Sequence, residues 1–323
     1  MSLPLSPPLK PQLALSRKEL PTGEQYSYEV KLDGFRCLAF VDGEEIFLQS
    51  RAGKPLGRYF PELELPPGRY VLDGEIVVRG ENGREDFDAL GQRIHPAVSR
   101  VQRLSLETPA RYVAFDLLAR GQESLLERPF DERRAALEEL LSGDEFTDAP
   151  VELMEASRTV GDAREWLLHA EGAIAKERTA PYRPGERKGM TKIKRVRTID
   201  AVVAGWRPGK EPDTVGALIL SLYGDSSADA ELRVVGHCSG FNAAEKRRLV
   251  GFLKPFQTGE RGTADPSRWS AGRDLEWVAL RPELVVEIDF DHVSAGRIRH
   301  GAKLRRWRED KDPHECTFDQ LSA

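Results

Sequence analysis

Two residues able to act on phosphorus lie close together near the start of the chain, a lysine at position 31 and an arginine at position 36. Residues 26–30 alternate and predict a β-strand. Side chains two apart share a strand face, so we expect Glu29 and Lys31 to point the same way. Gly34 predicts a tight turn that returns Arg36 toward Lys31. The stretch is a candidate phosphate-handling nucleophile; the alternative interpretation is a hairpin with solvated charges.

Carboxylates occur inside apolar stretches that predict further strands. Asp73 and Glu75 lie two apart within residues 72–76, and Glu171 opens the apolar stretch 171–177. Burying an unpaired charge is costly, so strands that carry such charges inward need partner charges or a ligand. Carboxylate oxygens are ligands that divalent cations prefer. Glu75 and Glu171 are therefore candidate metal ligands.

Two lysines and an aromatic ring complete the set that nucleotidyl transfer requires. Lys192 and Lys194 share one face of a predicted strand, where they could hold an α-phosphate. Nearby cations also favour the neutral, nucleophilic amine of a lysine such as Lys31. Phe115 could stack on a base, although an aromatic residue in a strand is more often part of the core. The combination points to transfer of a nucleotide onto a lysine.

The composition is that of an ordinary soluble globular protein. The chain has 323 residues, of which 40% are hydrophobic and 31% charged, so two domains could each bury a core. No long apolar run predicts a membrane span, and the start lacks a signal pattern. The three cysteines are far apart and form no disulfide framework or zinc motif. This usage predicts a reducing, cytoplasmic location.

The charge is distributed unevenly along the chain. The formal net charge is −5, which is not typical of a nucleic-acid-binding protein. Acidic residues dominate residues 123–165, whereas basic residues dominate 178–210 and recur in 297–311. This distribution predicts a molecule with one phosphate-facing side.

Up to about residue 197, the pattern predicts helices mixed with mainly antiparallel strands. Residues 1–25 are expected to form an irregular arm. Strands are expected within residues 26–80 and over 111–118 and 171–176, and helices over 85–92, 130–141 and 159–169. The strand 111–118 should place Val113, Phe115 and Leu117 on one face.

The second part predicts a small barrel. Strands are expected over 198–206, 215–223, 231–236 and 283–293, and one amphipathic helix over 242–252. Four or five short strands with one helix are typical of an OB-fold. We therefore expect one domain over residues 1–198 and an OB-fold domain over 199–323.

Six stretches resemble, in order, the motifs of the covalent nucleotidyltransferases, which include ATP-dependent DNA ligases, RNA ligases and mRNA capping enzymes. They are 31–36 (KxDGxR), 50–51, 115–118, 171–176 (EGxxxK), 192–194 and 304–311 (ending in RxDK). The resemblance implies an α+β fold, in which a nucleotidyltransferase domain of ATP-grasp-like antiparallel sheets and helices precedes a β-barrel OB-fold domain.

The resemblance also implies a role for each matching residue. Lys31 would carry AMP covalently, Glu29 would contact the adenine amino group, and Phe115 would stack on the base. Nucleotide-binding residues would be Glu29, Lys31, Arg36, Arg51, Glu75, Phe115, Lys176, Lys192, Lys194 and Arg308. Catalytic residues would be Lys31, Lys192, Lys194, Asp310 and Lys311. Glu75 and Glu171 would bind Mg²⁺ or Mn²⁺, and ATP would be the nucleotide.

Among the branches, the chain most resembles small stand-alone bacterial ATP-dependent DNA ligases, relatives of the ligase domain of bacterial end-joining proteins. This implies sealing of nicked or broken duplex DNA in repair by a monomer, with DNA end-binding or repair proteins as partners and no membrane. One alternative is an RNA ligase or guanylyltransferase of the same superfamily. The other is a non-catalytic OB-type nucleic-acid binder. Labelling by ATP or by GTP shows which nucleotide the protein accepts, and an unlabelled protein that still binds DNA would support the non-catalytic binder.

Overall fold

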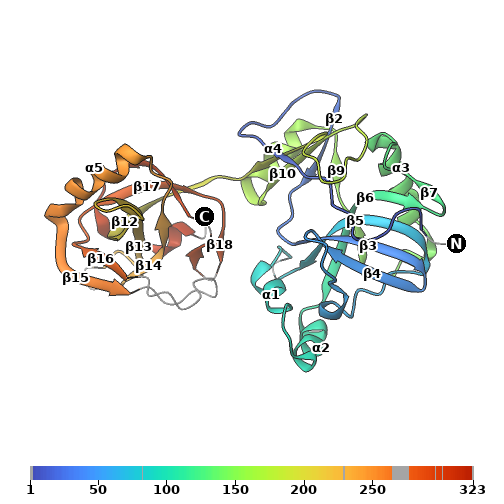
Figure 1. Cartoon of the computed structure of the whole chain (residues 1–323), viewed down its shortest axis with the longest axis horizontal. Helices are drawn as coiled ribbons and strands as arrows, with labels where there is room; N and C mark the ends of the chain where they lie inside the picture. Colours follow the sequence, from blue (N-terminus) through green and yellow to red (C-terminus); the bar gives the residue numbers. More distant parts are fainter. Residues whose placement is uncertain are drawn as a thin grey trace. The chain divides into compact units, whose positions relative to one another are not determined.

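The chain folds into two compact units, Met1–Arg195 and Val196–Ala323 (Figure 1). The computed structural model describes residues 3–81, 83–227, 230–263, 276–294, 296–299 and 301–321. Mainly antiparallel sheets with a few helices build the first unit, and the described part of the second is built by an antiparallel sheet and the helix α5. The fold class expected from the sequence is confirmed, while the domain boundary at residue 198 stays a prediction.

The larger sheet of the first unit has six strands. Its order is β4-β3-β5-β6-β7, and β8 pairs with β6. The strands are β3 (Phe35–Gly43), β4 (Glu45–Ser50), β5 (Gly68–Val78), β6 (Ala110–Arg120), β7 (Glu123–Ser124) and β8 (Val151–Leu153). All pairs are antiparallel except β6 with β8. One face packs on the core around Leu72, Ile76 and Tyr112.

A second sheet of five strands lies in the same unit, in the order β1-β11-β10-β2-β9. Its strands are β1 (Leu15–Ser16), β2 (Tyr26–Val30), β9 (Ala156–Ser157), β10 (Gly172–Glu177) and β11 (Met190–Lys194). The N-terminal arm is less irregular than expected, because it contributes β1 and packs Leu3, Leu5 and Leu9 against the core.

The helices of the first unit are α1 (Phe87–Gln92), α2 (Val98–Glu107), α3 (Phe130–Leu141) and α4 (Val160–His169). The structure confirms the predicted helices over 85–92, 130–141 and 159–169. The sequence reasoning missed α2 because its apolar pattern is ambiguous: Val101 and Leu104 are buried, whereas Val98 and Leu106 are exposed. None of the described helices is long and apolar enough to span a membrane.

The connection between β2 and β3 is not the hairpin of the alternative interpretation. Strand β2 belongs to the five-stranded sheet and β3 to the six-stranded sheet, so residues 31–34 carry the chain from one sheet to the other. Gly34 is needed for close packing instead, since an added Cβ would lie 2.4 Å from the carbonyl oxygen of Ile76.

The second unit is a seven-stranded sheet in the order β14-β13-β12-β16-β15, with β17 pairing with β12 and β20. Its strands are β12 (Arg197–Pro208), β13 (Val215–Tyr223), β14 (Leu232–Cys238), β15 (Gln257–Thr263), β16 (Glu276–Leu280), β17 (Val285–Phe290) and β20 (Lys303–Trp307), beside the small pair β18 (Val293–Ser294) and β19 (Arg297–Ile298). The sequence reasoning missed β15, β16 and β20; β15 and β20 are rich in polar or basic residues, so they have no clear apolar pattern.

In the described part of the second unit, the expected α-helix is present as α5 (Ala243–Leu253). Asn242 caps it: its side chain accepts from the Glu245 amide, and the Glu245 side chain accepts from the Asn242 amide. Among the residues that the structure describes, the short 3₁₀ helices are η1 (Gly57–Tyr59), η2 (Asp144–Phe146), η3 (Lys254–Phe256), η4 (Pro313–Glu315) and η5 (Phe318–Leu321).

Candidate active site

Lys31 lies where the two sheets of the first unit meet. Its backbone amide donates to the carbonyl of Gly172, 2.9 Å away, which fixes it beside the start of β10. Its Nζ lies 2.5 Å from Oε2 of Glu171, and Nζ of Lys194 lies 3.6 Å from Oε1 of the same carboxylate. Three neighbouring strands, β2, β10 and β11, therefore bring the predicted nucleophile, carboxylate and phosphate-binding lysine together.

A cluster of cations surrounds this carboxylate. Partial burial lowers the pKa of the Lys192 amine, and the charges of Lys31, Lys194 and Arg51 lower it further. Arg51 follows directly after β4 and is exposed, so it approaches the cluster from the six-stranded sheet. Such a concentration of positive charge suits a polyphosphate.

Glu29 has a different partner from Lys31. Both lysine-to-carboxylate distances at Glu29 are short: Nζ of Lys176 lies 2.9 Å from Oε1 and 2.8 Å from Oε2. The Glu29 carboxyl is 2% exposed, and this burial raises its pKa. Lys176 also donates to the carbonyl of Phe115 over 3.1 Å and lies 4.7 Å from the centre of that ring. The pair thus forms a wall beside the Phe115 ring.

Arg36 lies on the ring of Phe115, with its guanidinium carbon 4.4 Å from the ring centre. Its Nε and Nη2 each donate to Asp73 over 2.6 Å. The Tyr182 hydroxyl donates to the same carboxylate over 2.6 Å. Burial lowers the pKa of the Arg36 guanidinium, but the charge and hydrogen bonds of Asp73, together with Tyr182 and Glu75, raise it overall. Asp73 and Tyr182 therefore hold Arg36 against the Phe115 ring, the surface on which a base was predicted to stack.

The Glu75 carboxyl lies among charges of both signs. Burial raises its pKa to about 7. The cations of Arg36 and Lys31 oppose this effect, and the charges of Asp73 and Glu171 add to it. A carboxyl group that ionises near neutrality, beside a second carboxylate, fits a divalent cation.

The two carboxylates, Glu75 and Glu171, are too few to hold a metal ion alone but suit a cation that also binds the phosphates of a nucleotide. Within the described parts of the chain, no three His, Cys, Asp or Glu residues form a metal site. Mg²⁺ is usually held by one or two carboxylates together with substrate phosphates. Glu75 and Glu171 are close enough to influence each other's charge, so the pair fits that arrangement.

The strand β6 changes face at Phe115. Opposite β5, Ala114 pairs with Gly74 and Asp116 with Asp73, so Phe115 is the extra residue of a bulge. Val113 and Phe115 pack together in one cluster, while Leu117 belongs to the core on the other side. The prediction that all three share a face is therefore wrong, because alternation does not continue through a bulge.

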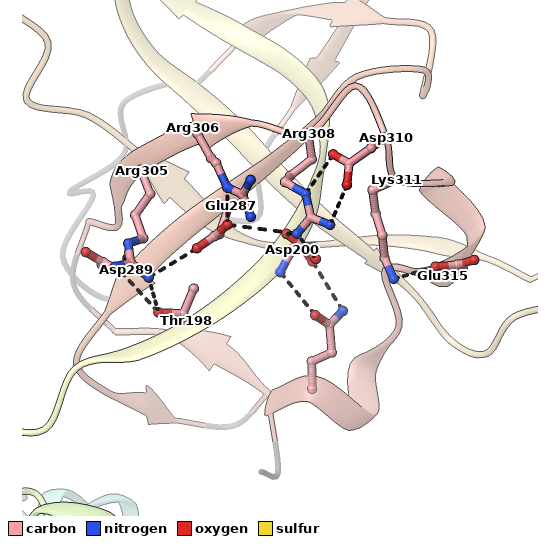
Figure 2. A network of polar contacts seen from close by, with 11 residues as sticks. Thr198, Asp200, Glu287, Asp289, Arg305, Arg306, Arg308, Asp310, Lys311 and Glu315 are labelled. Carbon is pink, nitrogen blue, oxygen red and sulfur yellow. Dashed lines mark hydrogen bonds and ion pairs between the residues drawn. The ribbon is translucent and has the colours of Figure 1, made fainter.

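The remaining predicted site residues lie in the second unit, which is described by itself. The Arg308 guanidinium contacts Asp200 over 3.0 Å and Asp310 over 2.9 Å, and Lys311 pairs with Glu315 (Figure 2). The adjoining Arg306 lies 2.6 Å from Glu287. These contacts place the 304–311 motif on one surface of the barrel.

Sequence reasoning missed several buried polar partners. The guanidinium of Arg133 pairs with Asp116 over 2.7 Å, and Tyr182 binds Asp73. Arg133 lies three residues after Phe130 and four before Leu137, which are both buried, so its place on the apolar stripe was a usable signal. Arg93 is also buried and pairs with Glu62 over 2.6 Å, which makes it a structural residue.

The comparisons with known proteins agree over both units. The family model "ATP dependent DNA ligase domain" matches residues 11–194, and "ATP dependent DNA ligase C terminal region" matches residues 211–311.

Two curated relatives are similar along nearly their whole length. DNA ligase C1 of Mycolicibacterium smegmatis is 43% identical over 347 residues, covering 100% of this chain and 96% of the relative. DNA ligase C of Mycobacterium tuberculosis is 43% identical over 350 residues, covering 99% of this chain and 96% of the relative. The solved structure of mycobacterial DNA ligase D complexed with ATP and MES matches with a TM-score of 0.52 and 26% identity, covering 96% of this chain and 98% of that one.

Proposed function

The chain belongs to the ATP-dependent DNA ligases, and from this premise we propose that Lys31 is the residue that carries AMP. The observation that supports the proposal is that two lysines meet one carboxylate: Nζ of Lys31 lies 2.5 Å and Nζ of Lys194 lies 3.6 Å from oxygens of Glu171. A single amine with a carboxylate on one side and cations around it is suited to attack a phosphate.

The proposed reaction has three steps. Nζ of Lys31 attacks the α-phosphorus of ATP, loses a proton, and forms a P–N bond as pyrophosphate leaves. The 5′-phosphate of a nick then attacks the same phosphorus, which breaks the P–N bond and leaves AMP on the DNA. Finally the 3′-hydroxyl attacks the activated phosphate, forms the phosphodiester and releases AMP.

The neighbours of Lys31 have roles that follow from their contacts. Glu171 orients Nζ through the 2.5 Å contact and is placed to accept hydrogen from it. Lys192 and Lys194 face the same point and neutralise negative charge that develops on the α-phosphate. Arg51 adds a further cation on the exposed side, where the ribose or the nick would lie.

We assign adenosine to the space beside Phe115. The ring supplies a stacking surface, and the buried Glu29–Lys176 pair supplies an acceptor and a donor for the base edge. Arg36 and Glu75, which face each other across β3 and β5, would hold the ribose. Because Arg36 now covers the ring at 4.4 Å, it has to shift when the base stacks.

A divalent cation, Mg²⁺ or Mn²⁺, would lie at Glu75 and Glu171, where it would offset the charge of the phosphates. In the second unit, Arg308, Asp310 and Lys311 would orient pyrophosphate during the first step. We place these activities in a nucleotidyltransferase domain over residues 1–198 and an OB-fold domain over 199–323.

We further propose a biological setting for the enzyme. It would act in DNA repair on nicked or broken duplexes, as a cytoplasmic monomer, and DNA end-binding or repair proteins would be its partners. The three cysteines are free and buried, which agrees with a reducing compartment.

The test uses two substrates. Lys31→Ala is expected to remain unlabelled by radioactive ATP and to leave an ordinary nick open, yet to seal a pre-adenylated nick without ATP. Lys188→Ala is the matched control, because the side chain of this lysine is 76% exposed and its amine pairs with Glu186; it should behave like wild type.

Either of two results would contradict the assignment. One is sealing of ordinary nicks by Lys31→Ala with ATP, which would place AMP on another residue. The other is labelling of the wild type by GTP rather than ATP, which would favour a guanylyltransferase.

A further inference from the structure

Arg308 is held between two carboxylates of its own unit. Its Nη1 lies 3.0 Å from both oxygens of Asp200, while Nε and Nη2 donate to the two oxygens of Asp310 over 2.9 and 3.0 Å. Figure 2 shows the guanidinium between the two acids. The Glu287 carboxylate lies farther away, with its Oε2 atom 3.9 Å from Nη1 of Arg308.

The two acids differ in burial. The side chain of Asp200 is 16% exposed and that of Arg308 is 18% exposed, whereas Asp310 is 66% exposed. Asp310 is also only two residues from Arg308, so it moves with the same loop. Asp200 is therefore the fixed point of the arrangement.

The barrel holds Asp200 rigidly. On adjacent strands, Asp200 of β12 lies opposite Glu287 of β17, which lies opposite Arg306 of β20. Gln320 near the C-terminus accepts from the Asp200 amide over 3.1 Å and donates to its carbonyl over 3.2 Å. Because strand pairing and Gln320 hold the Asp200 backbone in place, its carboxylate can set the direction of a long arginine side chain.

We propose that Asp200 is a positioning residue for the first step of the reaction, acting through Arg308. This inference rests on the proposed function, in which Arg308 meets the pyrophosphate end of ATP. Arginine has five N–H donors, and the contacts with Asp200 and Asp310 leave one N–H of Nη2 available for a phosphate oxygen. Holding the guanidinium in one orientation before ATP arrives removes the cost of ordering it during the reaction.

The role is specific to one step. Only the attack of Lys31 on ATP, and its reversal by pyrophosphate, involve the pyrophosphate group. The sealing of a nick that already carries AMP does not. A residue that positions Arg308 should therefore affect the first step and leave the last unchanged.

The test compares Asp200→Asn with Asp289→Asn in the full-length protein. Asp289 is the matched control, because it lies on the same strand as Glu287 and pairs with Arg305 over 3.2 Å, not with Arg308. Asp200→Asn is expected to slow labelling by saturating ATP, and release of AMP by pyrophosphate, each about tenfold. Sealing of a pre-adenylated nick should proceed at the wild-type rate, and Asp289→Asn should be normal in all three assays.

A second comparison establishes that the effect passes through Arg308. In an Arg308→Ala background, Asp200→Asn should cause no further loss, because the group it positions is already absent. Losses that multiply would overturn the proposal, as would equal slowing of labelling and of sealing by Asp200→Asn.

The outcomes also separate this inference from the proposed function. If Arg308→Ala is slow in labelling but Asp200→Asn is normal, only the positioning role of Asp200 fails. If Arg308→Ala is labelled at the wild-type rate, the role of Arg308 fails and the inference falls with it. If the wild type is not labelled by ATP, the proposed function itself fails.

Discussion

At Glu75, burial and four neighbouring charges decide the protonation state. Charged residues inside apolar strands are costly unless they are paired, and most of those in the site have a close opposite charge, as Lys31 has Glu171 and Arg36 has Asp73. Glu75 is different, because burial raises its pKa to about 7 despite the nearby cations. In the absence of ligands it is therefore protonated over part of the physiological range.

This raised pKa predicts a pH-dependent stability. Between the ordinary pKa of 4.5 and about 7, the folded protein holds a proton on Glu75 that the unfolded chain releases. The contribution of this proton to the free energy of unfolding is therefore largest below pH 4.5 and is lost as the pH rises through 7. Glu75→Gln should remove this loss. Between pH 5 and 8, the free energy of unfolding of the variant should therefore exceed that of the wild type by on the order of 1 to 3 kcal/mol.

Urea unfolding of both proteins across this pH range measures the effect. Glu64→Gln, at an exposed position in the same unit, is the control and should follow the wild type. A wild type and Glu75→Gln whose unfolding free energies change in parallel with pH would show that Glu75 ionises at its ordinary pKa.

Among the elements, the connection from β2 to β3 does most to assemble the site. It leaves the five-stranded sheet at Lys31 and enters the six-stranded sheet at Phe35. Residues of both sheets therefore face Lys31: Glu171 and Lys194 from one, Glu75 from the other. Gly34 permits the entry, since a Cβ there would lie 2.4 Å from the Ile76 carbonyl and 2.7 Å from Cγ of Glu75.

Replacement of Gly34 by alanine should disturb both packing and chemistry. The backbone of β5 would have to move away, and overpacking of this kind costs about 1 to 3 kcal/mol. Because Glu75 moves with β5, labelling of Lys31 by ATP should also slow. Thermal unfolding and single-turnover labelling measure the two effects.

Gly91→Ala is the control for this prediction. A Cβ at Gly91 meets nothing within 4 Å, and alanine favours the helix α1 that contains it. This variant should be as stable as wild type or slightly more stable. Equal stability of Gly34→Ala and Gly91→Ala would show that β3 and β5 tolerate a wider separation.

For the whole molecule, the distribution of charge matters more than its sum. The net charge is −5, from 48 basic and 53 acidic residues, yet the basic residues gather at the site and along 297–311. In the second unit, Arg305 and Arg306 are 51% and 62% exposed although each pairs with an acid. Such surfaces bind DNA through its phosphates, independently of base sequence.

Binding through phosphates predicts a strong salt dependence. The KM for a nicked duplex should rise at least about tenfold between roughly 50 and 200 mM salt, because counterions released on binding compete at higher concentration. The KM should be nearly the same for nicks in different sequences. The rate of labelling by saturating ATP is the internal control and should change much less; a DNA KM that is independent of salt would argue against phosphate contacts.

The sequence by itself determined the features that depend on neighbours along the chain. The helix over residues 130–141 follows from its apolar spacing, and the strand β2 follows from alternation. Glu75, Glu171 and Lys194 stood out because charged residues in apolar strands need a partner or a ligand, and Lys31 stood out by its spacing from Glu29 and Arg36. These residues could be identified without knowing which side chains are in contact.

Only the tertiary structure decided the partners. Lys31 and Glu171 are 140 residues apart, Glu29 and Lys176 are 147 apart, and Arg308 and Asp200 are 108 apart. Such pairs depend on strand order and register, which local periodicity does not encode. The same reason explains the bulge at Phe115, the crossing between sheets at Gly34 and the strands β15 and β20, since each is stabilised by long-range pairing rather than by its own apolar pattern.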